Sequence, residues 1–257
     1  MEAPKITVVT PSFNQARFIE ATLRSVLRQK YPNLEYIVVD GGSTDGSVEI
    51  IQRYSDQLAY WVSEPDRGQT DALIKGFARA TGDILCYLCS DDLLEPWTLC
   101  EVADFFRKHP LAHAVYGDAV WIDVHGRPVR PKKEHPFNWF IWMYDHDFIP
   151  QPSTFWRREL YQRVGGLDPS FDLAMDADLF IRFAEVTSLL HNNRPWSRMR
   201  LYPEQKNQRF RARSDVEDVK IRHRYGIPNP RSWVQTPRRI LAKGMRVGWK
   251  LALGCYW

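Results

Sequence analysis

Acidic side chains in two segments of the sequence have the types and spacing needed to bind a cation or a polar ligand. Asp91 and Asp92 are adjacent in the segment CSDD, and Asp40 opens the segment DGGSTDG. Two neighbouring carboxylates repel each other unless a cation or hydrogen-bond donors offset their charge. Hard oxygen ligands suit Mg²⁺ or Mn²⁺, and water molecules and phosphate oxygens complete the coordination shell of such an ion. The pair therefore predicts a divalent-cation site, and a solvated loop before a helix is the alternative.

A third acidic segment, MDADLFIRF at residues 175–183, offers a candidate general base. If the segment is helical, Asp178 and Arg182 lie one turn apart and can form an ion pair. Asp176 lies about 200° from Asp178 around such a helix, and no cation stands four residues after it. Asp176 is therefore the better candidate to accept a proton from a substrate hydroxyl.

The elements that would position these acids alternate between strand and helix. Short β-branched or apolar runs predict strands, and apolar residues at helical spacing predict helices between them. The expected strands are Ile6–Thr10, Tyr36–Val39, Leu58–Val62 and Ile84–Leu88, and helices are expected near 19–27, 44–54 and 69–80. This order predicts an α/β fold with a mainly parallel, mixed sheet flanked by helices. Ligands bind such sheets beyond the carboxyl ends of the strands, where Asp40 and the Asp91–Asp92 pair stand.

Asp40 follows the second expected strand, where a carboxylate can accept hydrogen bonds from a ribose hydroxyl or a base N–H. Ser43 or Thr44 is expected to cap the next helix. The first strand is followed by Pro11-Ser12-Phe13-Asn14, without the glycines that a dinucleotide-binding turn needs. No Walker-type GK[ST] segment occurs in the sequence, so it predicts neither of these two nucleotide-binding folds.

The second half of the chain is less regular. Residues 117–128 predict a hairpin with His125-Gly126 as its turn, and a helix is expected over 176–186. The aromatic cluster at 137–144 predicts core, although Trp142 and Trp156 could instead stack on an acceptor sugar. Cys86 and Cys89 form a CxxC without a second pair, which favours core packing over a zinc or redox site.

Bulk composition bounds the class of protein. The 257 residues are 44% apolar and 26% charged, as expected of a globular chain with a sizeable core. The N-terminal residues show no signal-peptide pattern, and no apolar run approaches the ~20 residues that span a bilayer. Four cysteines in a chain of this length suit a reducing compartment. We therefore expect a cytoplasmic protein that could lie peripherally on the inner face of the membrane.

The net charge of +4 is unevenly distributed, because residues from Arg194 onward are strongly basic and residues 1–193 are acidic. We expect one domain over 1–213 and a basic helical extension over 214–257. In 237–257, Arg239, Lys243, Arg246 and Lys250 recur on one helical face among apolar residues. That pattern suits an interfacial helix on an anionic membrane surface, or equally a helix docked on its own domain or a neighbouring subunit. Binding of nucleic acid would depend on the basic tail alone, and nucleic acid is not expected as a partner.

Five segments resemble the family 2 glycosyltransferases, which have the GT-A fold. They are PSFNQARFIEATLRSVLRQKYPNLEYIVVDGGSTDGS, EPDRGQTDALIKGFARATGDI, CSDD, IPQPSTFWRRELYQRVGGLD and MDADLFIRF. They extend over roughly the first 210 residues, and their order and spacing together are specific. The resemblance implies an inverting transfer from a nucleotide-diphosphate sugar to the hydroxyl of a glycan or lipid-linked acceptor. It also implies Mg²⁺ or Mn²⁺ as the cofactor.

The resemblance also implies roles for individual residues. Asp92 looks like the metal ligand, Asp176 like the catalytic base, and Gln151 lies in a loop similar to one that lines the site. The implied donor-nucleotide contacts are Pro11, Phe13, Asp40, Asp71 and Asp91. Arg200 and Lys206 could offset charge on the departing diphosphate.

Three positions depart from the family pattern. Ile74 and Cys89 each stand where relatives often have Asn, and Tyr202 stands where many have His. These departures keep a second class open, a non-catalytic nucleotide-sugar-binding protein of the same fold. The intact Asp91, Asp92 and Asp176 favour an enzyme.

Overall fold

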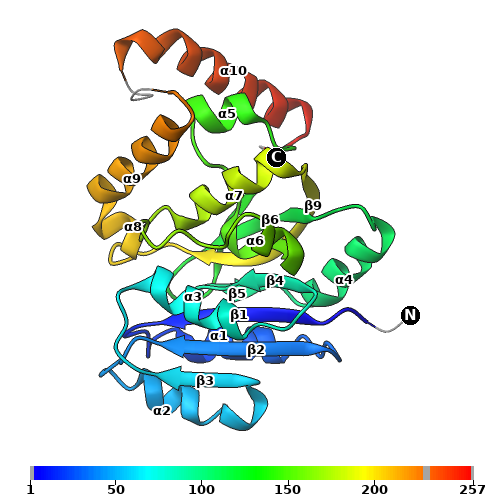
Figure 1. Ribbon diagram of the computed structural model, residues 1–257, viewed down its shortest axis with the longest axis vertical. Coiled ribbons are helices and arrows are strands. Elements are labelled where there is room, and N and C mark those ends of the chain that lie inside the picture. The colour runs from blue at the N-terminus through cyan, green and yellow to red at the C-terminus, as the bar shows by residue number, and fades with distance from the viewer. Residues whose placement is uncertain (1–2, 228–231, 256–257) are drawn as a thin grey trace.

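A mixed sheet forms the centre of the molecule (Figure 1). The computed structural model describes residues 3–227 and 232–255. The strands are β1 Ile6–Ser12, β2 Leu34–Asp40, β3 Tyr60–Ser63, β4 Ile84–Tyr87, β5 Leu93–Leu94, β6 Ala114–Ile122, β7 Pro128–Lys132, β8 Thr154–Arg157 and β9 Leu189–Arg200. Their order is β3-β2-β1-β4-β8-β6-β9-β5, with β7 paired to β6. The first four strands in this order are parallel, and β8 runs antiparallel to both neighbours.

Helices cover both faces of the sheet and enclose two apolar cores. They are α1 Ile19–Leu27, α2 Ser47–Gln52, α3 Gln69–Arg79, α4 Thr98–Lys108, α5 Trp139–Tyr144, α6 Arg158–Arg163, α7 Met175–Val186, α8 Lys206–Arg209, α9 Arg211–Arg224 and α10 Thr236–Ala252. Short 3₁₀ turns lie at Ser55–Gln57, Gln151–Ser153 and Trp233–Gln235. One core contains side chains of α3 and α7, and the other contains side chains of α1 and α4. Both faces are covered, which is why β1 and β2 are almost continuously buried.

The predicted strands and the helix over 176–186 are confirmed within a few residues. The hairpin is also confirmed, because β6 and β7 pair antiparallel and Gly126 has the positive φ of 80° that such turns favour. The cap predicted at Ser43 or Thr44 is wrong. Helix α2 begins after Gly46, and Asp45 accepts a hydrogen bond from the backbone N–H of Ser47 at 3.0 Å.

Two further expectations concern aromatic and apolar side chains. Trp142 and Trp156 have no exposed surface, so neither ring can stack on an acceptor, and the core prediction is confirmed for Trp142 but not for Trp139 of the same cluster, which is 37% exposed. Cys86 also lies in the core, whereas Cys89 is half-buried at the end of β4. Within the described part of the chain, no helix is long and apolar enough to cross a membrane.

The C-terminal helices lie on one side of the sheet, where α10 packs against α5 (Figure 1). Arg246 pairs with Asp145, and Lys250 Nζ lies 2.7 Å from Glu134 Oε2. Two of the four basic residues of that face, Arg246 and Lys250, therefore dock on the chain itself, whereas Arg239 and Lys243 are exposed. The predicted boundary between the domain and the C-terminal extension, at 213/214, stays a prediction, and it falls within α9, which begins at Arg211. Residues 228–231 and 256–257 of the predicted extension lie outside the described residues.

The close approach of α3 to β1 gives a test of the packing. A Cβ on Gly76 would lie 2.4 Å from Val9 Cγ1, so Gly76→Ala should destabilise the fold by about 1–3 kcal/mol. Gly244 on α10 has open space around it within the described chain, so Gly244→Ala should stabilise α10 by about 0.5–1 kcal/mol. Thermal unfolding of both variants checks this, and equal shifts would contradict the tight contact.

Candidate active site

The carboxyl ends of β1, β2 and β4 meet at one edge of the sheet. Ser12 pairs with Asp40 across β1 and β2, and Val9 pairs with Tyr87 across β1 and β4. Asp40 is the last residue of β2, and the Asp91–Asp92 pair follows β4 by a few residues. The parallel register thus brings acids that are 50 residues apart in the chain to the same edge.

Asp40 has no exposed surface, and its carboxylate orders the loop that follows it. Oδ2 accepts hydrogen bonds from the backbone N–H groups of Gly42 (3.1 Å) and Ser43 (2.8 Å) and from the Ser63 hydroxyl (2.8 Å). Oδ1 accepts a bond from the Ser43 hydroxyl at 2.6 Å. A ligand can therefore contact Asp40 only if one of these hydroxyls turns away.

Asp91 and Asp92 are held side by side by donors from β9 and the segment after it. The backbone N–H of Arg200 donates to Asp92 Oδ1 at 2.8 Å, and the Tyr202 hydroxyl donates to Asp91 Oδ2 at 2.8 Å. From α1, the Thr22 hydroxyl donates to the main-chain carbonyls of Ser90 and Asp92, both at 2.8 Å. The loop is therefore fixed from two sides, and the position of both carboxylates is set by the fold.

The electrostatics of the pair fit a cation. Burial, and then the negative charge of Asp91, raise the pKa of Asp92 well above its usual range. Burial also raises the pKa of Asp91. Cys89 Sγ and one oxygen of each carboxylate lie within 4.8 Å of one another. Among the described residues no protein donor reaches Asp92 Oδ2, so this oxygen is available to a ligand.

Cys89 links the acidic pair to the neighbouring elements. Its sulfur accepts a hydrogen bond from Gln69 Nε2 at 3.2 Å, and its thiol donates to Gln151 Oε1 at 3.7 Å. Gln151 Nε2 in turn donates to the Tyr87 carbonyl at 2.7 Å. Burial, and then three nearby carboxylates, raise the pKa of the Cys89 thiol. A protonated thiol is a poor ligand for a hard cation, which leaves the two carboxylates as the candidate ligands.

Asp176 lies at the first turn of α7, and α9 positions that turn. Glu217 Oε2 accepts hydrogen bonds from the backbone N–H groups of Asp172, Leu173 and Ala174 at 2.8–3.1 Å, immediately before α7. Asp178 Oδ2 accepts a bond from Arg182 at 2.6 Å, so the predicted ion pair is confirmed. Asp176 instead lines a cavity of about 710 Å³ together with Gln151.

Asp176 and the acidic pair lie close together. The charges of Asp91, Asp92 and Asp176 all raise the pKa of Cys89, and these acids come from the loop after β4 and from the first turn of α7, about 85 residues apart in the chain. Burial, and then the charge of Asp147, raise the pKa of Asp176 itself to about 7. A carboxylate with this pKa is suited to take a proton near neutral pH.

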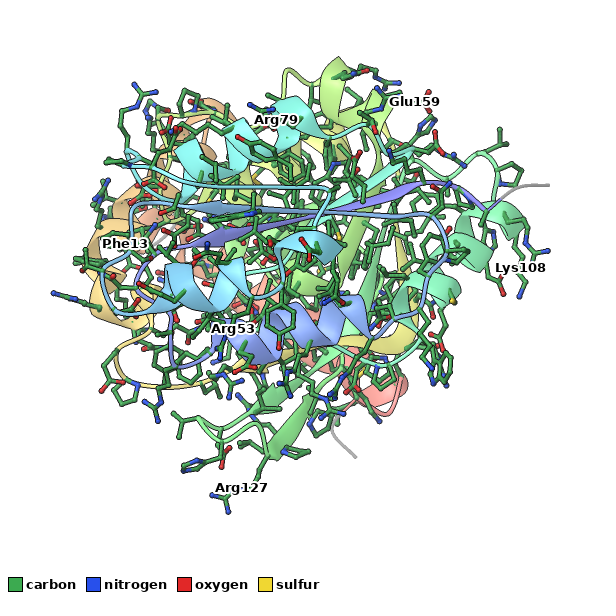
Figure 2. All side chains as sticks on the ribbon, turned by 90° about the horizontal axis from the view of Figure 1, so that it is seen from below. Phe13, Arg53, Arg79, Lys108, Arg127 and Glu159 are labelled. Atoms are coloured by element: carbon green, nitrogen blue, oxygen red, sulfur yellow. The ribbon has the colours of Figure 1, made fainter. Side chains whose placement is uncertain are left out.

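The remaining predicted site residues have different surroundings. Phe13 is 59% exposed at the end of β1 (Figure 2), whereas Pro11 is buried. Asp71 on α3 pairs with Arg67 at 3.0 Å. Lys206 Nζ donates to Asp172 Oδ1 at 2.8 Å.

Arg200 is 3% exposed, and its side chain binds the main chain. Nε donates to the Asp91 carbonyl at 2.8 Å, and Nη1 donates to the carbonyls of Asp123 (2.8 Å) and Val124 (3.0 Å). Its guanidinium carbon lies 4.5 Å from the centre of the Phe18 ring. These contacts connect β9, the acidic loop and the β6–β7 turn.

Three residues near the site were missed or misjudged from the sequence. Cys89 was assigned to the core, although its place directly before SDD was a signal that it borders the acids. Tyr202 appeared only as a departure from a pattern, and it binds Asp91. Asp147 gave no sequence signal, because it lies in the irregular segment between α5 and Gln151.

Comparison with known proteins identifies the family of the chain. The profile of the family described as "Glycosyl transferase family 2" matches residues 7–165, which include Asp40, Asp91 and Asp92. A "PGL/p-HBAD biosynthesis glycosyltransferase" of Mycobacterium bovis is 31% identical over 199 residues, covering 74% of this chain and 75% of that protein.

Two solved structures have a similar fold. S. aureus TarS 1-349 in complex with UDP aligns with a TM-score of 0.66 and 19% identity over 85% of this chain, which spans 64% of the TarS chain. A mannosyltransferase from Pyrobaculum calidifontis in complex with GDP-Man and Mn²⁺ aligns with a TM-score of 0.64 and 22% identity, over 99% of this chain and 76% of that one. Both likenesses show the fold, a GT-A type mixed sheet flanked by helices.

The raised pKa of Asp176 predicts a pH-dependent effect on stability. The unfolded chain releases this proton near its ordinary pKa of 3.8, whereas the folded protein keeps it until about pH 7. The contribution of Asp176 to the free energy of unfolding is therefore largest below pH 4 and falls as the pH rises to 7. The difference of about three pKa units corresponds to about 4 kcal/mol, so Asp176→Asn should change stability little at pH 4 and raise it by up to about 4 kcal/mol at pH 8.

Denaturant unfolding of wild type and variant at both pH values measures this difference. Asp56→Asn, at an exposed residue of the 3₁₀ turn that precedes β3, serves as the control and should show no such dependence. The same difference at pH 4 and pH 8 for Asp176→Asn would contradict the raised pKa.

Proposed function

The chain belongs to glycosyl transferase family 2, and on that basis we propose that it is an inverting enzyme of glycan or polysaccharide synthesis. It moves a sugar from a nucleotide-diphosphate donor to an acceptor hydroxyl. The observations that carry the proposal are that Cys89 borders the Asp91–Asp92 pair and that Gln151, which accepts the hydrogen bond of the Cys89 thiol, lines one cavity with Asp176. A cation site and a tuned base in one place are what this reaction requires.

The donor is proposed to bind at the carboxyl edge of β1, β2 and β4. The related solved structures hold UDP or GDP-Man. The proposed contacts are Pro11, Phe13, Asp40, Asp71 and Asp91. Phe13 offers an exposed ring for a base, and Asp91 keeps one carboxylate oxygen beyond the Tyr202 bond. For Asp40, direct contact requires the Ser43 or Ser63 hydroxyl to rotate away from the carboxylate.

Asp92, with Asp91 beside it, is proposed to hold Mg²⁺ or Mn²⁺. The free Oδ2 of Asp92 and the mutual repulsion of two buried carboxylates support this, and the mannosyltransferase structure contains Mn²⁺. When bound, the cation stabilises negative charge on the leaving diphosphate. Arg200 is proposed to position the acidic loop rather than touch the diphosphate, because its donors bind carbonyls. Lys206, 34% exposed, stays the candidate for diphosphate contact, and Gln151 for contact with the bound sugars.

The transfer itself is a direct displacement. The acceptor oxygen forms a bond to the anomeric carbon while the bond from that carbon to the diphosphate oxygen breaks. Asp176 takes the acceptor proton, which makes the hydroxyl a competent nucleophile. No covalent intermediate with the protein is needed, so configuration inverts. Since the base must be unprotonated, the transfer rate should rise with pH up to about 7.

Replacing the base tests the proposal. Asp176→Asn should lower the transfer rate by about 100-fold or more, while donor binding in the presence of Mn²⁺ stays within a few-fold of wild type. A panel of nucleotide sugars, assayed for hydrolysis and transfer with and without Mn²⁺, identifies the donor and measures the rate. Asp92→Ala is the complementary variant and should lose Mn²⁺-dependent donor binding in calorimetry.

A transfer rate of Asp176→Asn equal to that of wild type would contradict the assignment of Asp176 as the general base. Donor binding without turnover by wild type, across donors and acceptors, would favour the non-catalytic alternative instead.

We also propose that the outer face of α10 contacts an anionic membrane surface. Ile240 and Leu251 are three helical turns apart on the same face and are 68% and 53% exposed, and Leu241 is 57% exposed. Lys243 lies exposed beside them. Apolar side chains next to a cation on an outward face suit the boundary between headgroups and acyl chains.

Vesicle sedimentation tests this surface. The double variant Ile240→Ser/Leu241→Ser should bind vesicles of mixed neutral and anionic phospholipid about tenfold more weakly than wild type, because apolar burial is lost. Leu111→Ser removes an apolar side chain that is 90% exposed between α4 and β6, and it serves as the control. Equal loss in both variants, or no binding by wild type, would exclude the membrane role.

A further inference from the structure

A thiol stands among the acids of the candidate cation site. Cys89 Sγ and one oxygen from each of Asp91 and Asp92 lie within 4.8 Å of one another, and the described residues contain no other such group of three histidine, cysteine or carboxylate ligands. Atoms bound to one tetrahedral zinc ion lie roughly 3.5 Å apart, since Zn–O and Zn–S bonds are about 2.1 and 2.3 Å long. The three atoms are thus near the spacing of a shared ion before any of the side chains rotates.

The hydrogen bonds of Cys89 are compatible with a metal-bound thiolate. Its sulfur accepts a hydrogen bond from Gln69 Nε2 at 3.2 Å, and a thiolate accepts such a bond more strongly than a thiol does. The thiol donates to Gln151 Oε1 at the long distance of 3.7 Å. Loss of that contact leaves Gln151 in place, because its Nε2 still donates to the Tyr87 carbonyl at 2.7 Å.

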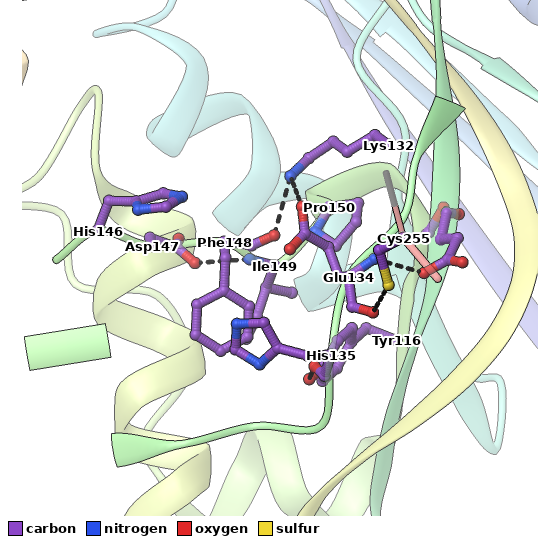
Figure 3. A network of polar contacts seen from close by, with 12 residues as sticks. Tyr116, Lys132, Glu134, His135, His146, Asp147, Phe148, Ile149, Pro150 and Cys255 are labelled. Carbon is purple, nitrogen blue, oxygen red and sulfur yellow. Dashed lines mark hydrogen bonds and ion pairs between the residues drawn. The ribbon is translucent and has the colours of Figure 1, made fainter. Parts of the chain in front are cut away.

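The other three thiols have different surroundings. Cys86 is buried in the core, where its sulfur donates to the Thr7 carbonyl at 3.8 Å. Cys255 donates to the main-chain carbonyl of Glu134 at 3.4 Å, as Figure 3 shows, and Cys100 lies on α4. None of these three belongs to a group of three possible ligands within residues 3–227 and 232–255. Cys89 is therefore the thiol to consider as a metal ligand.

The two kinds of ligand in this group prefer different cations. Carboxylates suit Mg²⁺ and Mn²⁺, whereas a thiolate favours softer ions such as Zn²⁺ and Cd²⁺. We propose that the acidic loop also binds thiophilic divalent cations, through Cys89 Sγ together with one oxygen each of Asp91 and Asp92. On binding, a bond from the cation to sulfur forms, the S–H bond breaks and the proton passes to solvent. No oxidant or reductant takes part.

A thiophilic cation in this place competes with Mg²⁺ or Mn²⁺, because the oxygens of Asp91 and Asp92 serve both kinds of ion. In the proposed transferase, Zn²⁺ would therefore act as an inhibitor that displaces the working cation. This consequence for transfer rests on the proposed function, whereas binding of the thiophilic cation does not. Cys89 thus makes the loop sensitive to free Zn²⁺ in a way that two carboxylates alone are not.

Cadmium titration of the full chain tests the thiol directly, because a Cd–S bond gives an ultraviolet charge-transfer band. Wild type should show this band, and Cys89→Ser should lose it. In calorimetry, Cys89→Ser should weaken Zn²⁺ binding by about 100-fold or more, since loss of even an outer-shell partner costs roughly 10–100-fold. Its Mn²⁺ affinity should stay within about twofold of wild type, because both carboxylates are intact. Thermal unfolding shows whether the variant remains folded.

Two further variants separate the cluster from other thiols and from Cys89 alone. Cys255→Ser removes a half-buried thiol outside the cluster, so it is the matched control and should keep both the band and the Zn²⁺ affinity. Asp92→Asn keeps an oxygen for the N–H of Arg200 and should weaken Zn²⁺ binding by about tenfold or more.

The proposal is overturned by any of four results. They are no band in wild type, a band that persists in Cys89→Ser, a band that Cys255→Ser loses equally, and a Zn²⁺ affinity that Asp92→Asn leaves unchanged. Because no sugar donor is present, these measurements do not depend on whether the chain transfers a sugar. Absence of glycosyl transfer would therefore contradict the proposed function and leave the thiophilic site standing.

Discussion

Two carboxylates buried next to each other are the constraint on which the site depends. Asp91 and Asp92 would repel each other in a flexible loop, and here the loop is held by bonds from α1, β9 and Tyr202. These donors come from residues 22, 200 and 202, so the pair is stable only when distant parts of the chain are assembled. The remaining electrostatic repulsion is the basis of the cation site that we propose for the pair. In the proposed enzyme, a bound cation would relieve this unfavourable arrangement.

The C-terminal helices take part in this assembly. Glu217 of α9 binds the backbone before α7 and thereby orients Asp176, and α10 closes one wall of the cavity through Arg246 and Lys250. Arg224 adds a bond to Asp178 Oδ1 at 2.7 Å on the far side of α7. The extension is therefore packed into the region of the base, although the family profile ends before it at residue 165. Differences in these helices between relatives would alter the acceptor side while leaving the donor edge unchanged.

Local patterns predicted the first half of the fold well, because buried parallel strands and amphipathic helices leave strong periodic signals. Asp40, Asp91 and Asp92 could be placed at one edge for the same reason. The surroundings of Asp176 could not, since they depend on Asp147, Glu217 and α10, which come together only through tertiary packing. Arg200 shows the limit in another way. Its charge suggested contact with a diphosphate, but its nitrogens bind carbonyls of the β6–β7 turn, which no local pattern encodes.

The bond that fixes Asp92 comes from the main chain of residue 200 and not from its side chain. The strand β9 supplies that N–H whatever residue occupies the position, except proline, which has none. Two functions at position 200 are thus chemically separable: the amide orients the acid, and the guanidinium joins the loops. Replacing the arginine would remove the bonds to the β6–β7 turn but keep the amide that orients the Asp92 carboxylate, so a change at this position is a poor guide to loss of the proposed cation site.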